Sequence, residues 1–139
     1  MTLAWTTLEI EPGKRLNILA AAGKLKEIRL LFPDFLHYCD MRGHQEDISA
    51  LVFHPSMPQI LFSGDTKASV FIWDIGTPSA NQSRLMRYQL LMRLRCPRLD
   101  VNPVLNLVFL DHYSYLVAGC EDGIFAWKIT EYRSEKRER

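Results

Sequence analysis

Residues 43–74 read GHQEDISALVFHPSMPQILFSGDTKASVFIWD, and this stretch decides the fold. It begins with a Gly-His pair and ends about thirty residues later with a Trp-Asp pair. Between the two pairs lie three short apolar runs, ISALVF, ILFSG and SVFIW, separated by turns. Their β-branched and aromatic content favours strands over helices, so the stretch predicts three consecutive short strands.

A Gly-His pair, three short strands and a Trp-Asp pair resemble one WD repeat, the unit of a four-stranded β-propeller blade. The resemblance implies that the histidine hydrogen-bonds through a serine toward the tryptophan, and that a turn aspartate fixes the histidine. The usual aspartate and glycine positions fall at Lys67 and Ala68, while Asp65 is offset. We therefore expect this blade to hold its turn less tightly. The blade-motif residues of this stretch are Gly43, His44, Ser63, Trp73 and Asp74.

The strand–glycine–strand pattern recurs twice more along the chain. The three glycines are Gly23, Gly64 and Gly119, separated by 41 and 55 residues. A WD repeat spans about 40–45 residues, so the second interval carries an insertion. An apolar inner strand precedes each segment, as LAWTTLEI, ISALVFHP and VLNLVFLD. The sequence predicts an all-β fold of about three four-stranded WD-repeat blades, over residues 3–42, 43–96 and 103–130, that form an incomplete β-propeller. Residues 131–139 are predicted to be a charged, disordered tail.

The flanking blades depart from the motif. The third blade has Asp122-Gly123 in its turn and Trp127 on its third strand, but Lys128 replaces the final aspartate. The first blade has Leu31 where the tryptophan is expected.

Outer strands are predicted at HYCDMRG (37–43) and RLMRYQLLMRLRC (84–96). In the second, every even position is apolar and only Leu91 breaks the odd series, which is the alternation of a strand with one buried face. Its Leu, Met and Arg content also suits a helix, but the alternation favours a strand. The segments GTPSANQS and CPRLDVNP are predicted surface loops.

Composition bounds the class of protein. The 139 residues are 47% hydrophobic and 24% charged, which is typical of a globular protein. The net charge of +1 argues against direct binding of nucleic acid by the chain as a whole. No apolar run is long enough to span a bilayer, and the N-terminus does not resemble a signal peptide, so no membrane partner is predicted. Cys39, Cys96 and Cys120 form no close pair, which argues against zinc and for reduced thiols in an intracellular protein.

Longer stretches resemble two related families of propellers. The segments 13–33 and 41–78 resemble the propeller of the leucine-rich-repeat and WD-repeat protein that associates with the origin recognition complex. They are more distantly similar to the embryonic ectoderm development subunit of the Polycomb complex. The segment LVAGCEDGIFAWKI (116–129) resembles a strand pair of the first family. The resemblance covers roughly residues 12–130.

The resemblance implies a nuclear, chromatin-associated interaction module. Its implied partners are origin recognition complex subunits, which act in DNA replication, or histone tails that carry repressive trimethyl-lysine marks. Such a mark requires an aromatic cage. The position ahead of Ala4-Trp5, which resembles one cage position, falls at or before Met1, and no cage residue carries over. Histone binding is therefore expected from the family alone.

No catalytic motif is present. The sequence contains no GxSxG, P-loop or HExxH pattern. The blade motif accounts for His44, and turn chemistry accounts for His54 and for the Asp111, His112, Ser114 set. We expect no enzyme activity, no catalytic or metal-binding residue and no cofactor.

An arginine cluster without acidic residues is the remaining candidate for a contact site. It could meet an acidic protein tail or a phosphate backbone, although the near-neutral chain favours the solvated face of an edge strand as the explanation. Its members are Arg84, Arg87, Arg93, Arg95 and Arg98.

Three blades cannot close a ring, because open ends leave apolar faces and strand edges uncovered. Two interpretations remain: an interaction module, and a truncated propeller fragment without an independent binding activity. Either predicts self-association or completion by further blades.

Overall fold

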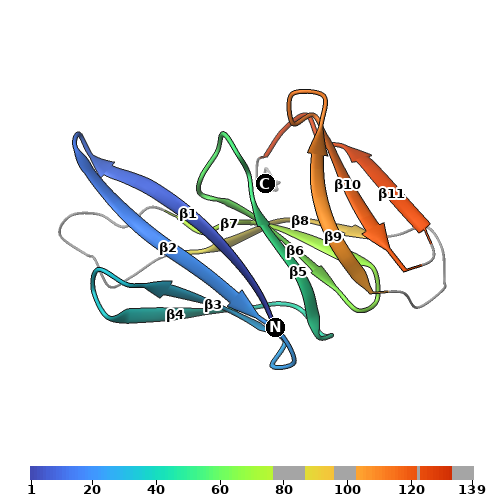
Figure 1. Ribbon diagram of the computed structural model, residues 1–139, viewed down its shortest axis with the longest axis horizontal. Coiled ribbons are helices and arrows are strands. Elements are labelled where there is room, and N and C mark those ends of the chain that lie inside the picture. The colour runs from blue at the N-terminus through green and yellow to red at the C-terminus, as the bar shows by residue number, and fades with distance from the viewer. Residues whose placement is uncertain (77–86, 96–102, 122, 133–139) are drawn as a thin grey trace, which may run out of the picture.

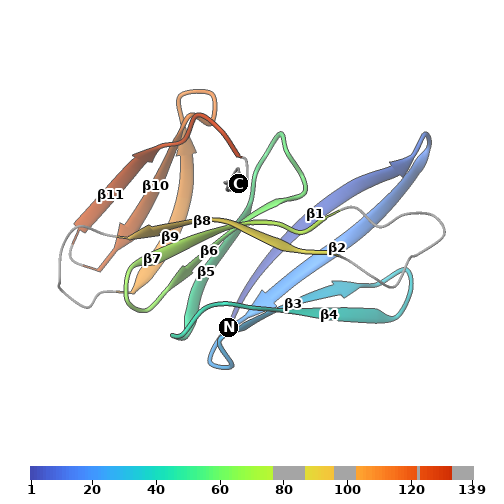
Figure 2. The ribbon, with the colours of Figure 1, turned by 180° about the vertical axis from the view of Figure 1, so that it is seen from behind.

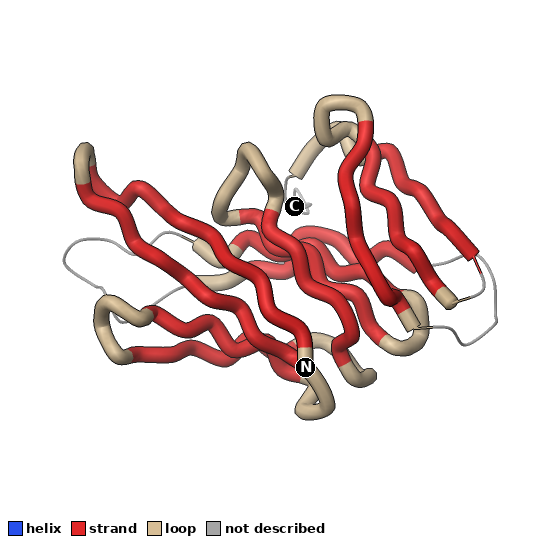
Figure 3. The backbone as a smooth tube through the Cα atoms, viewed as in Figure 1, coloured by secondary structure: helices blue, strands red, loops and turns tan. Residues whose placement is uncertain are grey.

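The computed structural model describes residues 1–76, 87–95, 103–121 and 123–132, and within these it contains strands and no helix (Figures 1 and 3). The all-β prediction is confirmed. The first sheet contains β1 (Thr2–Glu11), β2 (Lys14–Ala22), β3 (Glu27–Phe32) and β4 (His37–Arg42). The second contains β5 (Ile48–Phe53), β6 (Ile60–Asp65), β7 (Ser69–Asp74) and β8 (Gln89–Arg95). The third contains β9 (Val104–Leu110), β10 (Tyr115–Cys120) and β11 (Gly123–Lys128).

Each sheet is an antiparallel meander that corresponds to one blade of the incomplete propeller. The inner strand β5 contacts β1 of the first blade and β9 of the third, so the three inner strands lie side by side and the blades fan outward from them (Figure 1). The described part of the third blade has three strands, where four were predicted, and no described strand pairs with the outer edge of β11.

Two apolar cores fill the spaces between neighbouring blades. Leu61 and Trp73 of the second blade face the first blade, whereas Phe62 and Ile72 face the third. The second blade is therefore covered on both sides, which explains why its strands are almost continuously apolar. Every residue of β6 is buried.

The outer strand β8, visible across the back of the molecule in Figure 2, confirms the choice of strand over helix. The expectation that its even positions share one face is wrong. Trp73 pairs with Leu90 and Ile72 pairs with Met92, so Leu91 is the extra residue of a β-bulge. Because the bulge rotates the strand, Leu90 packs in the first core while Met92 and Leu94 pack in the second.

The described chain continues beyond the predicted domain end at residue 130. The ring of Tyr132 packs against the second core and lies 5.9 Å from the ring of Phe62. The folded part therefore extends at least two residues further than expected. The remainder of the predicted tail, and most of the predicted loops at 76–83 and 96–103, lie outside the described residues. No described helix is long and apolar enough to cross a membrane.

Candidate functional site

Four polar side chains of the second blade form a buried hydrogen-bonded relay. His44 Nε2 lies 2.6 Å from Ser63 Oγ, and Trp73 Nε1 donates to the same Oγ at 2.8 Å. On the other side of the ring, His44 Nδ1 lies 3.0 Å from Asp65 Oδ2. One proton assignment satisfies every group: Trp73 donates to Ser63, Ser63 donates to His44, and His44 Nδ1–H donates to ionised Asp65.

Asp65 also holds the β6–β7 turn, so the expectation of a loosely held turn is wrong. Its Oδ1 accepts the backbone N–H groups of Lys67 at 2.9 Å and Ser69 at 3.1 Å. Ala68 adopts the left-handed φ of +57° that a glycine usually supplies. The aspartate comes two residues earlier than the usual pattern because it ends β6 itself and reaches forward over the turn.

The pKa of Asp65 is lowered. Burial acts in the opposite direction and raises it, but hydrogen bonds from His44, Ser69 and Lys67 together outweigh this effect. The aspartate is therefore an anion with three donors, as a buried carboxylate requires.

Ser63, His44 and Asp65 are hydrogen-bonded in the same order as a catalytic triad. A substrate, however, has no access to the serine hydroxyl. Ser63 is 0% exposed, and its oxygen already accepts the indole N–H of Trp73. No substrate atom could approach the hydroxyl within attack distance without opening the core. The relay fastens the strands of one blade to each other.

The other motif residues also lie at turns and close contacts. Asp74 Oδ1 accepts the N–H of Gly76, at a turn where the glycine has a φ of +80°. A Cβ on Gly43 would lie 2.8 Å from the indole of Trp73, so the glycine lets the loop pass over the ring. On the third blade, Trp127 pairs with Leu116 as Trp73 pairs with Leu61, but Trp127 is only half-buried. Gly123 begins β11, and Asp122 lies outside the described residues.

Three of the five cluster arginines are described, all at or before the outer edge of the second blade and all exposed. Arg93 lies over the ring of Phe71, with its Cζ 5.3 Å from the centroid. No described carboxylate forms a salt bridge with Arg87, Arg93 or Arg95. Arg84 and Arg98 lie outside the described residues.

Histidine 54 and the β9–β10 turn occupy the rim between the second and third blades. His54 Nδ1 accepts the N–H groups of Ser56 and Met57, and burial lowers the pKa of its ring, so the neutral form is fixed in the turn. Asp111 and His112 both have positive φ, and the Ser114 N–H donates to the Asp111 carbonyl. Asp111, His112 and Ser114, which resemble a catalytic triad in sequence, therefore lie in a tight turn.

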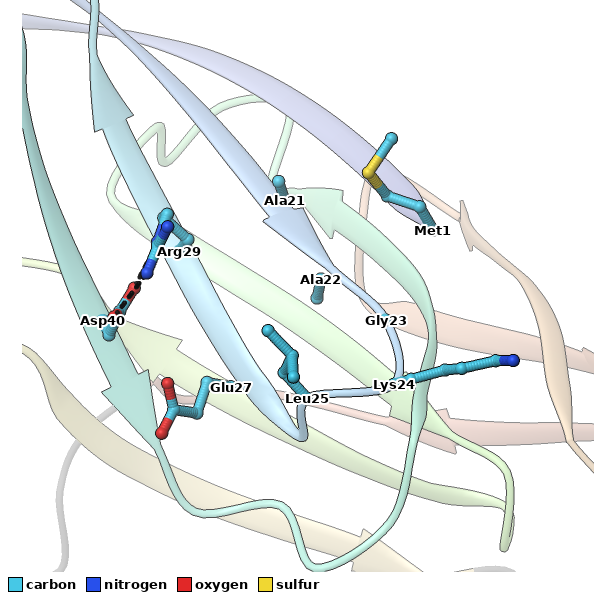
Figure 4. A pocket seen from close by; sticks show the side chains of 9 residues that line it. All are labelled: Met1, Ala21, Ala22, Gly23, Lys24, Leu25, Glu27, Arg29 and Asp40. Carbon is cyan, nitrogen blue, oxygen red and sulfur yellow. Dashed lines mark hydrogen bonds and ion pairs between the residues drawn. The ribbon is translucent and has the colours of Figure 1, made fainter.

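A hollow of about 400 Å³ opens on the face of the first blade that points away from the second (Figure 4). Met1, Ala21 and Leu25 line its apolar part, and Arg29 donates from Nε to Asp40 at 2.8 Å along its edge. None of the site residues predicted from the sequence lines this hollow. Within the described ranges, no group of His, Cys, Asp and Glu is arranged to hold a metal ion.

The radial antiparallel sheets and the His–Ser–Trp–Asp relay define blades of an incomplete WD-repeat propeller. Residues 1–139 match the family described as "Leucine-rich repeat and WD repeat-containing protein 1, WD domain". The chain belongs to this family, which confirms the resemblance found in the sequence.

Individual proteins with sequences similar to this chain carry the name of the same family. The chain is 34% identical over 133 residues to leucine-rich repeat and WD repeat-containing protein 1 of Xenopus tropicalis, covering 92% of this chain and 19% of the relative. It is 33% identical over 141 residues to the protein of the same name from Mus musculus, covering 98% and 21%. The chain therefore spans about a fifth of the length of these curated relatives.

Solved structures share the fold. A crystal structure of an active polycomb repressive complex 2 in the basal state superposes with a TM-score of 0.73 at 18% identity, covering 96% of this chain and 26% of that chain. A humanized mutant of the Chaetomium thermophilum complex, bound to an inhibitor, gives a TM-score of 0.72 at 18% identity, with 94% and 26% covered. At this identity the likeness shows the fold alone.

Proposed function

We propose that this chain is part of a non-enzymatic protein-interaction scaffold that acts on chromatin in the nucleus. The observation that carries the proposal is membership of the leucine-rich-repeat and WD-repeat family over residues 1–139. The geometry supports it, because the buried polar groups of the second blade bind one another and leave exposed loops and faces for partners. We propose no cofactor.

Origin recognition complex subunits and histone tails are the partners that the family resemblance suggests. Purified chain immobilised on a resin would be offered recombinant origin recognition subunits and, separately, histone peptides with and without trimethyl-lysine. We expect saturable retention of a subunit or of the trimethylated peptide. Equal retention of both peptides contradicts histone-mark reading, and retention of neither class of partner contradicts the chromatin role.

The exposed arginines of the second blade are the proposed contact for an acidic segment of such a partner. The double change Arg87→Glu with Arg95→Glu reverses two charges without touching Arg93, which packs on Phe71. We expect weaker partner retention and a smaller dependence on salt. The control Lys24→Glu reverses an exposed charge on the first blade and should leave retention unchanged.

The alternative is a propeller fragment without its own binding activity, which the uncovered faces of the first and third blades favour. Size-exclusion chromatography and a thermal melt separate the two. A monomer with a cooperative melt supports an autonomous module, whereas aggregation without a transition supports the fragment.

A further inference from the structure

A hollow of about 650 Å³ opens at the rim where the second and third blades meet. Three segments surround it: the β5–β6 turn, the β9–β10 turn and the stretch that follows β11, which lies between the two turns (Figures 1 and 2). Val108, Leu110 and Ile124, which lie on the open face of the third blade, do not line it. The hollow therefore belongs to the junction of the second and third blades and not to the face on which a further blade would pack.

Aromatic rings from different segments line this hollow. His54 of the β5–β6 turn is 4% exposed. The ring of Tyr113 lies 5.3 Å from that of His54 and at 69° to it, and the ring of Tyr132 lies 5.4 Å away at 76°. Both tyrosines therefore stand steeply to the imidazole at the wall of the hollow. Flat apolar groups of a ligand pack well against such rings.

Two polar groups of this lining have no hydrogen-bond partner among the described residues. His54 Nδ1 accepts the backbone N–H groups of Ser56 at 3.1 Å and Met57 at 3.0 Å, so in the neutral ring the proton is on Nε2, which makes no hydrogen bond. The hydroxyl of Tyr132 is buried and is likewise without a partner. Because unsatisfied polar groups are costly, both groups are stabilised by a ligand that brings acceptor atoms.

The electrostatics of the lining select a neutral acceptor. The Nε2–H of His54 can only donate, so it offers nothing to the ammonium group of a lysine. Glu131 lies at the hollow, and none of the described cations forms a salt bridge with it, so its carboxylate repels an anionic ligand. The acceptor that remains is an uncharged carbonyl oxygen, such as that of a peptide bond.

We propose that this hollow binds a proline-rich segment of a partner protein in the polyproline II conformation. Proline has no backbone N–H, so such a segment brings carbonyl acceptors and apolar rings and leaves few donors unsatisfied. Aromatic-lined grooves recognise segments of this kind. An arginine beside the prolines is favoured by Glu131. The site rests on the proposed scaffold function and names the class of peptide that one of its contact surfaces binds.

The probe is a labelled oligoproline peptide with one central arginine, and fluorescence anisotropy measures its binding to the 139-residue chain. We expect saturable binding, and in NMR spectra we expect slower solvent exchange of the His54 Nε2–H proton, because a carbonyl oxygen accepts it. The same peptide with alternate prolines in the D configuration keeps its composition but cannot form the polyproline II helix. It should bind at least about tenfold more weakly.

Tyr132→Phe tests the site on the protein, because it removes only a hydroxyl that has no partner in the free chain. It should weaken binding about three- to tenfold, the effect of one hydrogen bond, without lowering the melting temperature of the free chain. Tyr38→Phe is the matched control, since it removes a hydroxyl from an exposed tyrosine of the first blade and should leave binding unchanged.

Glu131→Lys tests the charge at the hollow. It should weaken binding of the arginine-containing peptide and strengthen binding of the same peptide with glutamate in place of arginine. Glu121→Lys reverses an exposed charge that does not line the hollow, and should change neither affinity.

Absence of saturable binding, equal binding of the D-proline peptide or undiminished binding to Tyr132→Phe would overturn the proposal. Binding of a lysine-rich peptide without proline in the same hollow would overturn it as well, because the hollow would then be a cation site. Failure of the proposed function has a different signature. Oligoproline binding with no retention of chromatin partners upholds the peptide site and removes the chromatin role, and the reverse result removes only the peptide site.

Discussion

The hydroxyl of Ser63 joins three parts of the second blade, because it contacts His44 from the loop before β5 and Trp73 from β7 while standing on β6. Ser63→Ala removes this atom and leaves the indole N–H and a histidine nitrogen unpaired in the core. We expect a loss of about 1–3 kcal/mol in the free energy of unfolding. Urea denaturation would measure it. Ser114→Ala, which loses a hydroxyl bonded only to Asp111 in an exposed turn, should cost much less; equal losses would contradict the relay's structural role.

The carboxylate of Asp65 makes the stability of the blade depend on pH. Because its folded pKa lies below that of an unfolded aspartate, about 3.9, its ionisation stabilises the fold fully above that value. The contribution is lost as the pH falls through the lower, folded pKa. Asp65→Asn should therefore be destabilised near pH 7, and its difference from the native chain should shrink below about pH 4.

Urea denaturation from pH 7 down to pH 3 would test this dependence. Asp47→Asn is the matched control, since its carboxylate is half-buried in the preceding loop but makes no hydrogen bond with described residues. A constant difference between Asp65→Asn and the native chain across the pH range would argue against an ionised Asp65.

At the residue scale the sequence predicted the histidine, serine and tryptophan positions but not the aspartate. Counting along a standard repeat placed the acid at Lys67, whereas a carboxylate at the end of β6 reaches both His44 and the turn amides. Spacing rules miss Asp65 because its hydrogen bonds depend on where its carboxylate oxygens lie and not on its position in the repeat. They also expect a glycine at position 68, whereas Ala68 adopts the left-handed φ of the turn itself.

At the scale of elements, the second and third blades are in close contact at Gly64. A Cβ there would lie 2.6 Å from Val104 Cγ1 and 2.7 Å from its Cβ. Gly64→Ala should cost about 1–3 kcal/mol, because both strands are held by their sheets and cannot separate freely. Gly119→Ala, at the corresponding glycine of the third blade, meets nothing closer than 3.9 Å and should be nearly neutral.

A second change tests the cause of this cost. Val104→Ala removes Cγ1 and Cγ2, two of the three atoms that the new Cβ would meet, and leaves only the Val104 Cβ contact. The double variant Gly64→Ala with Val104→Ala should therefore lose less stability than the sum of the single variants. Thermal or urea unfolding of the four chains gives the coupling energy. Strict additivity would show that the cost of Gly64→Ala arises within β6 and not between the blades.

Strand existence was more predictable than strand orientation. Alternation identified β8 correctly, but the bulge at Leu91 reverses which core Leu90 meets, and a bulge has no reliable signature in a strand of leucines and arginines. The charged neighbours of Tyr132 predict a tail, but its ring packs on the second core through a contact that is distant in sequence.

At the scale of the whole molecule, the second blade is covered on both faces and the other two on one. The open face of the first blade carries Leu3 and Trp5, the latter 61% exposed, and the open face of the third carries Val108, Leu110 and Ile124. In a closed propeller each of these faces would meet a neighbouring blade. The sequence predicts this incompleteness, because repeat counting finds about three blades and three blades cannot close a ring.

The open face of the first blade should therefore drive association of the 139-residue chain in solution. Wild-type chain is expected to elute with a mass that rises with concentration, because exposed contiguous apolar surface favours contact between molecules. The double change Leu3→Lys with Trp5→Lys places charges on that face and should reduce the association measured by light scattering. Its melting temperature should stay close to wild type, since both side chains are exposed and the first core lies on the opposite side of the sheet.

Leu36→Lys, an exposed leucine in the β3–β4 turn, adds a charge elsewhere and should leave association unchanged. If Leu36→Lys reduces association as much as the double change does, net charge and not the open face controls it, and the uncovered face is not the surface through which the chain associates.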